Sequence, residues 1–319
     1  MIKWGIMGSG NIANSFVKGL QVIEEADLYA VASKSKGKGE AFAEKYQIKK
    51  VYNSYEELAK DPEVDVIYIS TINSLHEACI DLAIDNHKSV LCEKPLSLDA
   101  DTCKRLCKKA RNEKVFLMEA FWTKFLPSYQ KAKQLVENGK IAEIQNIKSS
   151  FCFKADPKTC IRHLTKNLGG GILFDVGIYG LELACDLFGE NPIRMIHLTS
   201  KGNAEVDTDS SIILNFGSGR NANLHFSFNF DQKQDLYIHG TKGTIKMPSF
   251  WNGTKVFHYD DDDKKKSVYE FPFKGNGYEY EALEVIKCLK EKALESSIMS
   301  HERSITIACL IDEARKINS

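Results

Sequence analysis

The stretch that decides the fold is IKWGIMGSGNIA, residues 2–13. Its apolar first half, residues 2–7, predicts a short buried strand, and a helix is expected to follow the turn and run to about residue 24. Between them stands the pattern G-x-G-x-x-A. In this pattern the first glycine permits a tight turn, the second lets a pyrophosphate approach the backbone, and the third small residue lets helix and strand pack closely. The stretch therefore predicts the start of a dinucleotide-binding domain.

The phosphates of the dinucleotide are expected at the start of this helix, where free N–H groups and the positive end of the dipole meet. A glycine turn that binds nothing is the alternative, because such turns are common. We predict that the turn contacts the cofactor through Gly8, Ser9, Gly10, Asn11 and Ile12.

The second expected strand, residues 27–32, ends without the carboxylate that usually binds the adenine ribose of NAD. The sequence SKSK, residues 33–36, follows instead. A hydroxyl group and several cations suit a ribose 2′-phosphate, so Ser33, Lys34 and Lys38 predict NADP, with NAD possible. The alternative is a solvated basic turn at the start of the next helix.

The next apolar strand, residues 64–69, precedes the sequence STINSLH, which ends at His76. We assign Thr71, Asn73 and His76 to the cofactor site. Two interpretations of His76 stay open, namely a side chain that faces the cofactor and a surface histidine.

Glu93 and Lys94 directly follow another apolar strand, residues 89–92, and precede Pro95. The carboxyl end of a buried parallel strand is where open α/β sheets bind ligands. An ammonium group there can bond to a substrate oxygen and favour its negative charge. We therefore predict that both residues contact the cofactor and that Lys94 is catalytic. A salt bridge at the edge of a loop is the alternative.

The alternation of strands and helices predicts a doubly wound parallel sheet for residues 1–121, the dinucleotide-binding domain. From residue 122 to 319 the pattern changes to an α+β domain. Strands between about residues 144 and 271 predict a large, open, mostly antiparallel sheet, with hairpins at 217–220 and 240–243. Such a sheet needs a cover for its apolar face, and we expect a partner subunit to provide it. This second domain is predicted to bind substrate and to form the dimer.

One helix is expected to interrupt this sheet, opened by the sequence GGGILFDVGIY, residues 169–179. Asp175 and Tyr179 are four residues apart and are expected on one helix face. A tyrosine near Lys94 is a suitable proton donor, because a cation lowers the pKa of a phenol. The alternative is a tyrosine that only packs in an apolar helix.

Composition excludes several classes of protein. The chain of 319 residues has 43 basic and 43 acidic side chains, so the basic footprint of a nucleic-acid-binding protein is missing. We expect no membrane span, because no apolar run reaches about 18 residues. The start leads directly into a strand, so no secretory leader is expected. The nine cysteines show no CxxC pattern, so no metal site is predicted. Scattered free thiols fit a reducing cytoplasm.

The motifs occur in the order GxGxxA, TxNxxH, EKP, EAFWTKFLP and GGGxLxDxGxY. This order resembles the Gfo/Idh/MocA oxidoreductases and covers nearly the whole chain. The segment MEAFWTKFLP, residues 118–127, is similar to the branch that holds dimeric dihydrodiol dehydrogenases and NADP-dependent D-xylose dehydrogenases. The sequence YEA at residues 280–282, Glu295, Ser296 and Asp312 agree with that branch.

The resemblance implies a Rossmann domain, followed by a domain with an open sheet that commonly mediates dimerisation. It implies that Lys94 is the catalytic lysine, that Tyr179 takes the acid/base role of a histidine found in many members, and that Asp175 bonds to a substrate hydroxyl group. Branch members often place arginine where Lys34 and Lys38 stand here. Since lysine lacks the fork of arginine, selectivity for NADP is expected to be weaker.

The predicted function is hydride transfer between a nicotinamide cofactor and a secondary alcohol or carbonyl of a sugar, polyol or trans-dihydrodiol. The expected assembly is a homodimer or a dimer of dimers. Two other classes stay open, namely a dinucleotide-sensing regulator without turnover, and an NAD-dependent glycosidase that works by oxidation, elimination and reduction. The residues assigned to substrate binding are Phe121, Trp122, Arg162 and Asp175. Aromatic walls suit a sugar face or a dihydrodiol ring, although Trp122 would equally serve as core.

Overall fold

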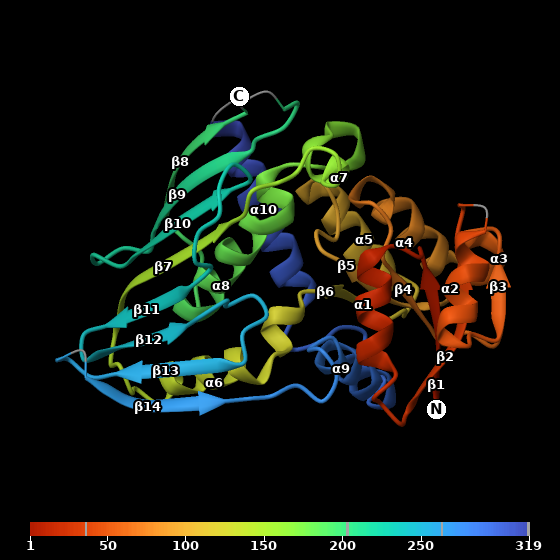
Figure 1. The fold of residues 1–319 in the computed structure, drawn as a ribbon, viewed down its shortest axis with the longest axis horizontal. Helices are drawn as coiled ribbons and strands as arrows, with labels where there is room; N and C mark the ends of the chain where they lie inside the picture. The colour runs from red at the N-terminus through yellow and green to blue at the C-terminus, as the bar shows by residue number, and fades with distance from the viewer. Residues whose placement is uncertain (36, 202–203, 263, 318–319) are drawn as a thin grey trace. The chain divides into compact units, whose positions relative to one another are not determined.

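The computed structural model describes residues 1–35, 37–201, 204–262 and 264–317, so Lys36 of the predicted basic turn lies outside the described residues. By packing, the chain forms two units (Figure 1). The first unit comprises Met1–Trp122 together with Phe273–Ala308, and the second comprises Thr123–Pro272 with the described residues from Cys309 onward. The predicted division into functional domains at residues 121 and 122 stays a prediction.

The first unit is built on a parallel six-stranded sheet with the strand order β3-β2-β1-β4-β5-β6. This order reverses direction beside β1, as it does in doubly wound dinucleotide-binding sheets. The strands are β1 (Ile2–Met7), β2 (Ala26–Ala32), β3 (Lys50–Tyr52), β4 (Val66–Ile69), β5 (Ser89–Glu93) and β6 (Leu117–Ala120). The helices are α1 (Asn11–Leu20), α2 (Lys38–Tyr46), α3 (Tyr55–Lys60), α4 (His76–Asp85), α5 (Ala100–Asn112) and α9 (Glu279–Lys290).

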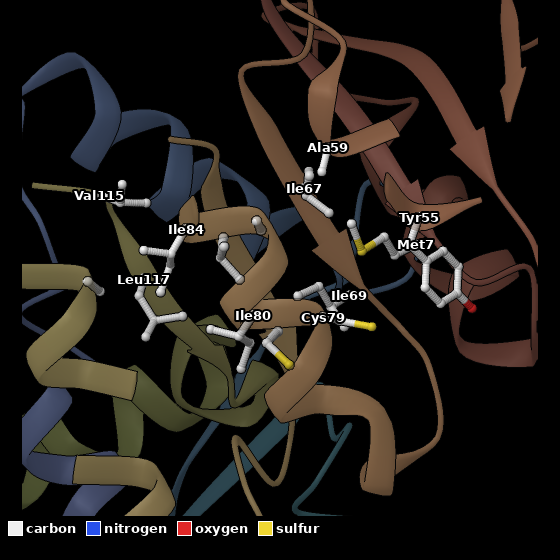
Figure 2. Packing of buried hydrophobic residues seen from close by; sticks show 14 of the residues in the cluster. Met7, Tyr55, Ala59, Ile67, Ile69, Cys79, Ile80, Ile84, Val115 and Leu117 are labelled. Carbon is white, nitrogen blue, oxygen red and sulfur yellow. The ribbon is translucent and has the colours of Figure 1, made fainter. Parts of the chain in front are cut away.

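Side chains alternate along β1 and fill two separate cores, because successive residues of a strand point to opposite faces. On one face, Met7 joins a cluster with residues of α3, α4 and α5, whose labelled members are shown in Figure 2. On the other face, Trp4 packs against Phe16 of α1, and Phe16 stacks on Tyr68 of β4 with ring centroids 3.7 Å apart. Tyr278, just before α9, meets the edge of Phe16. The segment 273–308 therefore contributes to the core of the first unit.

The second unit is built on an eight-stranded sheet with the order β14-β13-β12-β11-β7-β10-β9-β8. All neighbours are antiparallel except β7 and β10. The predicted fold class, a doubly wound sheet plus a large and mostly antiparallel sheet, is confirmed. The strands are β7 (Ile144–Cys152), β8 (Arg194–Ser200), β9 (Asp209–Asn215), β10 (Asn221–Ser227), β11 (Leu236–Gly240), β12 (Gly243–Met247), β13 (Lys255–Tyr259) and β14 (Lys265–Glu270).

Helices α6 (Pro127–Glu137) and α8 (Ile178–Phe188) pack on this sheet, α6 over β12 and β13 and α8 over β7 and β10. The last helix of the described chain is α10 (His301–Ile317). Helix α8 lies very close to β10, because a Cβ added to Gly180 would come within 2.5 Å of the Phe226 ring. Among the described residues, no helix is both long and apolar enough to cross a membrane.

The regular α-helix predicted around Asp175 was wrong at its start. Residues Leu173–Gly177 form a π-helical turn, and α8 begins only at Ile178. In a π-helix the hydrogen bonds join residues five apart, and such turns often mark functional sites. Asp175 therefore lies on the π-helical turn and Tyr179 in the first turn of α8, and a shared face for the two side chains stays a prediction.

Candidate active site

The turn between β1 and α1 has the shape that a bound pyrophosphate requires. Gly8 has a positive φ of 98°, and a Cβ there would lie 3.1 Å from the carbonyl oxygen of Ser70. Gly10 caps α1, and a Cβ built on it meets nothing within 4 Å. The space beside Gly10 and the free N–H groups of the first turn, where Asn11 and Ile12 are exposed, fit a dinucleotide phosphate.

Ser33, which follows β2, contacts the glycine turn between β1 and α1. The hydroxyl groups of Ser9 and Ser33 lie 3.1 Å apart, and Ser33 also accepts a hydrogen bond from the backbone N–H of Ser35. Lys34 and Lys38 are exposed, and the Lys34 ammonium lies 4.8 Å from the centre of the Tyr55 ring. The structure thus brings Ser33 to the glycine turn, and Lys34 and Lys38 follow it in the chain.

The turn that carries Lys94 is fixed on both sides. Strand β5 ends at Glu93, whose carboxylate accepts a 2.5 Å hydrogen bond from the Tyr68 hydroxyl. On the other side, the backbone N–H of Leu96 donates to the carboxylate of Glu119 at 2.9 Å. The peptide bond between Lys94 and Pro95 is cis. The half-buried carboxylate of Glu93 and the buried carboxylate of Glu119 therefore flank a half-buried Lys94 and fix the turn that carries it.

His76 lies inside the first unit, so its interpretation as a surface histidine was wrong. Its side chain is 0% exposed, and Nδ1 lies 2.8 Å from the carbonyl oxygen of Pro95. Nε2 lies 3.3 Å from the carbonyl oxygen of Thr71. The ring therefore links the two loops that follow β4 and β5. Asn73 is also buried, in the 3-10 turn Asn73–Leu75, and a contact of these residues with cofactor stays a prediction.

Sequence patterns did not indicate Glu281 as a functional residue, and it lies buried near Glu93. Its side chain is 0% exposed, and neither carboxyl oxygen has a hydrogen-bond partner among the described residues. Burial, with the charge of Glu93 adding to it, raises the pKa of Glu281 well above its usual range.

We expect Glu281→Gln to remove a pH dependence from the stability of the protein. Above the usual glutamate pKa of about 4.3, the unfolded chain releases this proton and the folded chain keeps it. The free energy of unfolding therefore falls by about 1.4 kcal/mol per pH unit until the raised pKa is reached. Urea unfolding at several pH values measures both slopes, and Glu40→Gln on α2 controls for the loss of a carboxylate. Parallel curves for wild type and Glu281→Gln would contradict a raised pKa.

In the second unit, Asp175 is held by two neighbouring side chains of helix α7 (Ile161–Leu164). Arg162 Nη2 lies 3.0 Å from Asp175 Oδ1, and His163 Nε2 lies 3.3 Å from Asp175 Oδ2. The glycine stretch permits this approach, because a Cβ on Gly170 would come within 2.5 Å of the Arg162 carbonyl oxygen. Arg162 and Asp175, both predicted to bind substrate, are thus in contact with each other. His163 also contacts Asp175, and sequence patterns did not indicate it.

Tyr179 stands in the first turn of α8 and is 6% exposed, with its ring 5.9 Å from that of Phe151. In the first unit, Phe121 is 0% exposed and Trp122 is 6% exposed. The Trp122 ring stacks on Tyr278 at 4.3 Å. Both aromatic residues thus pack within the protein, and their contact with substrate stays a prediction.

A fully buried ion pair joins Lys124 to helix α8. Lys124 and Glu182 are 1% and 0% exposed at their side chains, and Lys124 Nζ lies 2.5 Å from Glu182 Oε1 and 3.1 Å from Asp186 Oδ1. Asp186 also accepts a hydrogen bond from the Tyr129 hydroxyl at 2.6 Å. Lys124 and Tyr129 together hold down the pKa of the Asp186 carboxyl despite its burial. This network connects the 3-10 turn Trp122–Phe125 to the helix that carries Tyr179.

A parallel doubly wound unit that opens with a G-x-G-x-x-A turn, combined with an open-sheet unit, is typical of a class of dinucleotide-dependent oxidoreductases. Residues 2–121 match the family model described as an oxidoreductase family with an NAD-binding Rossmann fold. Residues 129–246 match the GFO/IDH/MocA C-terminal domain. The chain belongs to the Gfo/Idh/MocA oxidoreductase family, as the motif order predicted, and it is an NAD(P)-dependent oxidoreductase.

Relatives match over their whole length. The chain is 37% identical over 324 residues to the trans-1,2-dihydrobenzene-1,2-diol dehydrogenase of Xenopus laevis, covering 98% of this chain and 96% of that protein. It is 30% identical over 332 residues to the enzyme of the same name from Homo sapiens, covering 99% and 96%.

Solved structures share the fold. A 3-ketoreductase from Actinomadura kijaniata in complex with NADP and TDP-benzene has a TM-score of 0.88 at 23% identity, covering 99% of this chain and 97% of that one. A levoglucosan dehydrogenase in complex with NADH and levoglucosan has a TM-score of 0.87 at 19% identity, covering 99% and 98%.

Proposed function

We propose that this protein oxidises a secondary alcohol of a sugar, polyol or trans-dihydrodiol, or reduces the corresponding carbonyl group. The observation that carries the proposal is full-length identity of 37% to a trans-diol dehydrogenase in a chain that retains Lys94, Asp175 and Tyr179. These are the residue types that hydride transfer at an alcohol needs, namely a cation, a hydroxyl acceptor and a proton carrier.

In the proposed mechanism, Tyr179 removes the proton of the reacting hydroxyl group, and Lys94 stabilises the negative charge that develops on that oxygen. Asp175 accepts a hydrogen bond from another substrate hydroxyl group and so orients the ring. Bound nicotinamide would supply the hydride chemistry, while the turn at residues 8–12 would hold its phosphates. The fixed backbone on both sides of Lys94 supports its role, because a preorganised charge is worth more to a transition state than a mobile one.

The experiment that tests this function is a panel of pentoses, hexoses and vicinal diols, followed by cofactor absorbance with NADP and with NAD. We expect turnover of at least one secondary alcohol, with cofactor reduced in equal amount to the alcohol consumed. Tightly held NAD with no net reduction would contradict the proposal, and so would cofactor binding without turnover of any substrate.

We further propose that NADP is preferred to NAD. Support comes from exposed Lys34 and Lys38 beside Ser33, with no carboxylate at the end of β2. Replacing both lysines by alanine is expected to raise the KM for NADP by about 10–100-fold, since a hydrogen bond to a charged group contributes about 1.5–3 kcal/mol. The KM for NAD is expected to stay nearly unchanged. Steady-state kinetics with both cofactors measures this, and Lys60→Ala on α3 is the control. An enzyme that prefers NAD would contradict the proposal.

We also propose a homodimer, or a dimer of dimers, joined through the eight-stranded sheet. Support comes from apolar side chains exposed on neighbouring strands, Ile196 (47%) and Leu198 (69%) on β8 and Ile213 (44%) on β9. Burial of such a patch favours association by about 25 cal/mol per Å² of apolar surface. Light scattering is expected to give at least twice the chain mass of 35.9 kDa, and Leu198→Asp is expected to reduce it. A wild-type mass equal to one chain at micromolar concentration would contradict this proposal.

For the compartment we propose the cytoplasm. All nine cysteines are free thiols, and seven of them are buried. Free thiols persist in a reducing compartment, whereas oxidising ones favour disulfides.

A further inference from the structure

The ammonium group of Lys34, in the turn that follows β2, lies over an aromatic ring. Lys34 Nζ is 4.8 Å from the centre of the Tyr55 ring, within the roughly 6 Å over which the face of a ring attracts a cation. Lys34 is exposed, and a long side chain in solvent ordinarily samples many rotamers. The Tyr55 ring therefore restricts where this ammonium group lies.

Tyr55 itself is held firmly in the first unit. It is the first residue of α3, and the Ser54 side chain caps that helix by accepting a 3.1 Å hydrogen bond from the backbone N–H of Glu57. Tyr55 is 7% exposed and belongs to the buried cluster on one face of the sheet, where Figure 2 shows its ring beside Met7. Burial raises the pKa of the Tyr55 phenol to about 12, so no phenolate competes with a phosphate for Lys34 at neutral pH.

The backbone that carries Lys34 is fixed at the end of β2. The backbone N–H of Ser33 donates to the carbonyl oxygen of Tyr52 at 3.3 Å, and the Ser33 hydroxyl group lies 3.1 Å from that of Ser9 in the glycine turn. The end of this strand is where a dinucleotide-binding sheet meets the adenine ribose. The backbone of Lys34 thus belongs to the turn expected to meet the ribose, while Tyr55 restrains the other end of its side chain.

Contact with a ring and contact with a phosphate are compatible. An ammonium group has three N–H donors, and a ring on one side leaves donors for an anion on the other. Restraining Lys34 before the nucleotide arrives also lowers the conformational entropy that binding would otherwise cost. The ring therefore favours a nucleotide that carries a phosphate at this position over one that lacks it.

We propose that Tyr55 is a positioning residue for the ribose 2′-phosphate of NADP and acts through the ammonium group of Lys34. This inference rests on the proposed preference for NADP, and it extends the specificity site from the end of β2 to helix α3. Tyr55 contributes to discrimination against NAD by placing a cation, without binding the nucleotide itself.

The test compares adenosine 2′,5′-bisphosphate, which carries the 2′-phosphate, with adenosine 5′-monophosphate, which lacks it, by isothermal titration calorimetry. The wild type is expected to bind the bisphosphate more tightly. Tyr55→Leu is expected to weaken the bisphosphate by about two- to fivefold, the size of an exposed cation–π contact, and to leave the monophosphate unchanged. Tyr55→Phe keeps an aromatic ring and is expected to bind both nucleotides as the wild type does.

A double-mutant cycle separates this role from packing. With Lys34→Ala already in place, Tyr55→Leu is expected to have no further effect on the bisphosphate. Tyr29→Leu on β2 is the matched control, because the Tyr29 ring lies 5.1 Å from Lys3 Nζ and 5.0 Å from Lys50 Nζ. Tyr29 is 8% exposed, close to the value for Tyr55, and its loss is expected to leave the ratio of the two affinities unchanged.

An affinity ratio that Tyr55→Leu leaves unchanged overturns the proposal. Tighter binding of the bisphosphate by Tyr55→Leu also overturns it, because the ring would then withhold Lys34 from the phosphate. An equal loss in the Lys34→Ala background assigns Tyr55 to packing and overturns it as well. A wild type that binds both nucleotides equally contradicts the preference for NADP, and this inference falls with it.

Discussion

Tyr179→Phe and Lys94→Ala are each expected to lower kcat by about 10²–10⁴-fold, the usual share of general acid–base catalysis. The phenylalanine variant lacks the hydroxyl group that carries the proton, and the alanine variant lacks the charge that stabilises the substrate oxygen. Single-turnover kinetics with NADP and an accepted alcohol isolates the chemical step. The double variant is expected to lose less than the product of the two single losses, because groups that act as a unit are not additive.

Two controls separate catalysis from packing. Tyr259→Phe, on strand β13 of the same unit, is expected to keep the wild-type kcat. Titration of NADPH fluorescence is expected to show normal cofactor binding in Tyr179→Phe, since its hydroxyl group is assigned to substrate. If Tyr179→Phe turns over like the wild type when chemistry is rate-limiting, Tyr179 is a packing residue and the proposed proton route is wrong.

Lys124→Met is expected to lower the free energy of unfolding by about 3–5 kcal/mol. The substitution removes the ammonium group from Glu182, whose side chain is 0% exposed, and a buried charge that loses its counterion is strongly destabilising. Methionine keeps most of the side-chain volume, so little of the effect comes from a cavity. Urea unfolding followed by circular dichroism measures the loss.

The double variant Lys124→Met/Glu182→Leu is expected to recover much of that stability, since replacing both members of a buried pair by apolar residues is often close to neutral. The matched control is Lys255→Met, which breaks the exposed pair with Glu270 on the same sheet. Exposed pairs contribute about 0–1 kcal/mol. Equal losses for Lys124→Met and Lys255→Met would contradict the assignment of the Lys124 network as a buried structural element.

Features written in short, continuous stretches of sequence were predicted well. The strand, glycine turn and helix of residues 2–20 follow from local pattern, although the helix ends at Leu20 and not near residue 24. Gly8 has the positive φ that the turn demands. The hairpin between β9 and β10 closes at the predicted glycines, with Asn215 paired to Asn221. In these cases the residues that form the element are also the residues that specify it.

Features that depend on contacts between distant segments were missed. Glu281 became notable only through Glu93, which is far away in sequence, and His163 only through the turn that carries Asp175. The π-helical turn lies where Gly177 and Gly180 pack against the Phe226 side chain, and helix propensity does not encode such packing. For His76, local pattern could not separate a surface position from the buried one that the carbonyl oxygens of Pro95 and Thr71 define.

The first unit is assembled from two separate parts of the chain, and this affects its biosynthesis. When residues 1–122 leave the ribosome, α9 and Tyr278 have not yet been made, so the Tyr278 ring that contacts Phe16 and Trp122 is still missing. Translation of residues 123–272 takes on the order of ten seconds. During that time the aromatic core around Phe16 lacks one of its members. A chain that terminates before residue 273 never completes this core, because α9 and Tyr278 are missing from it.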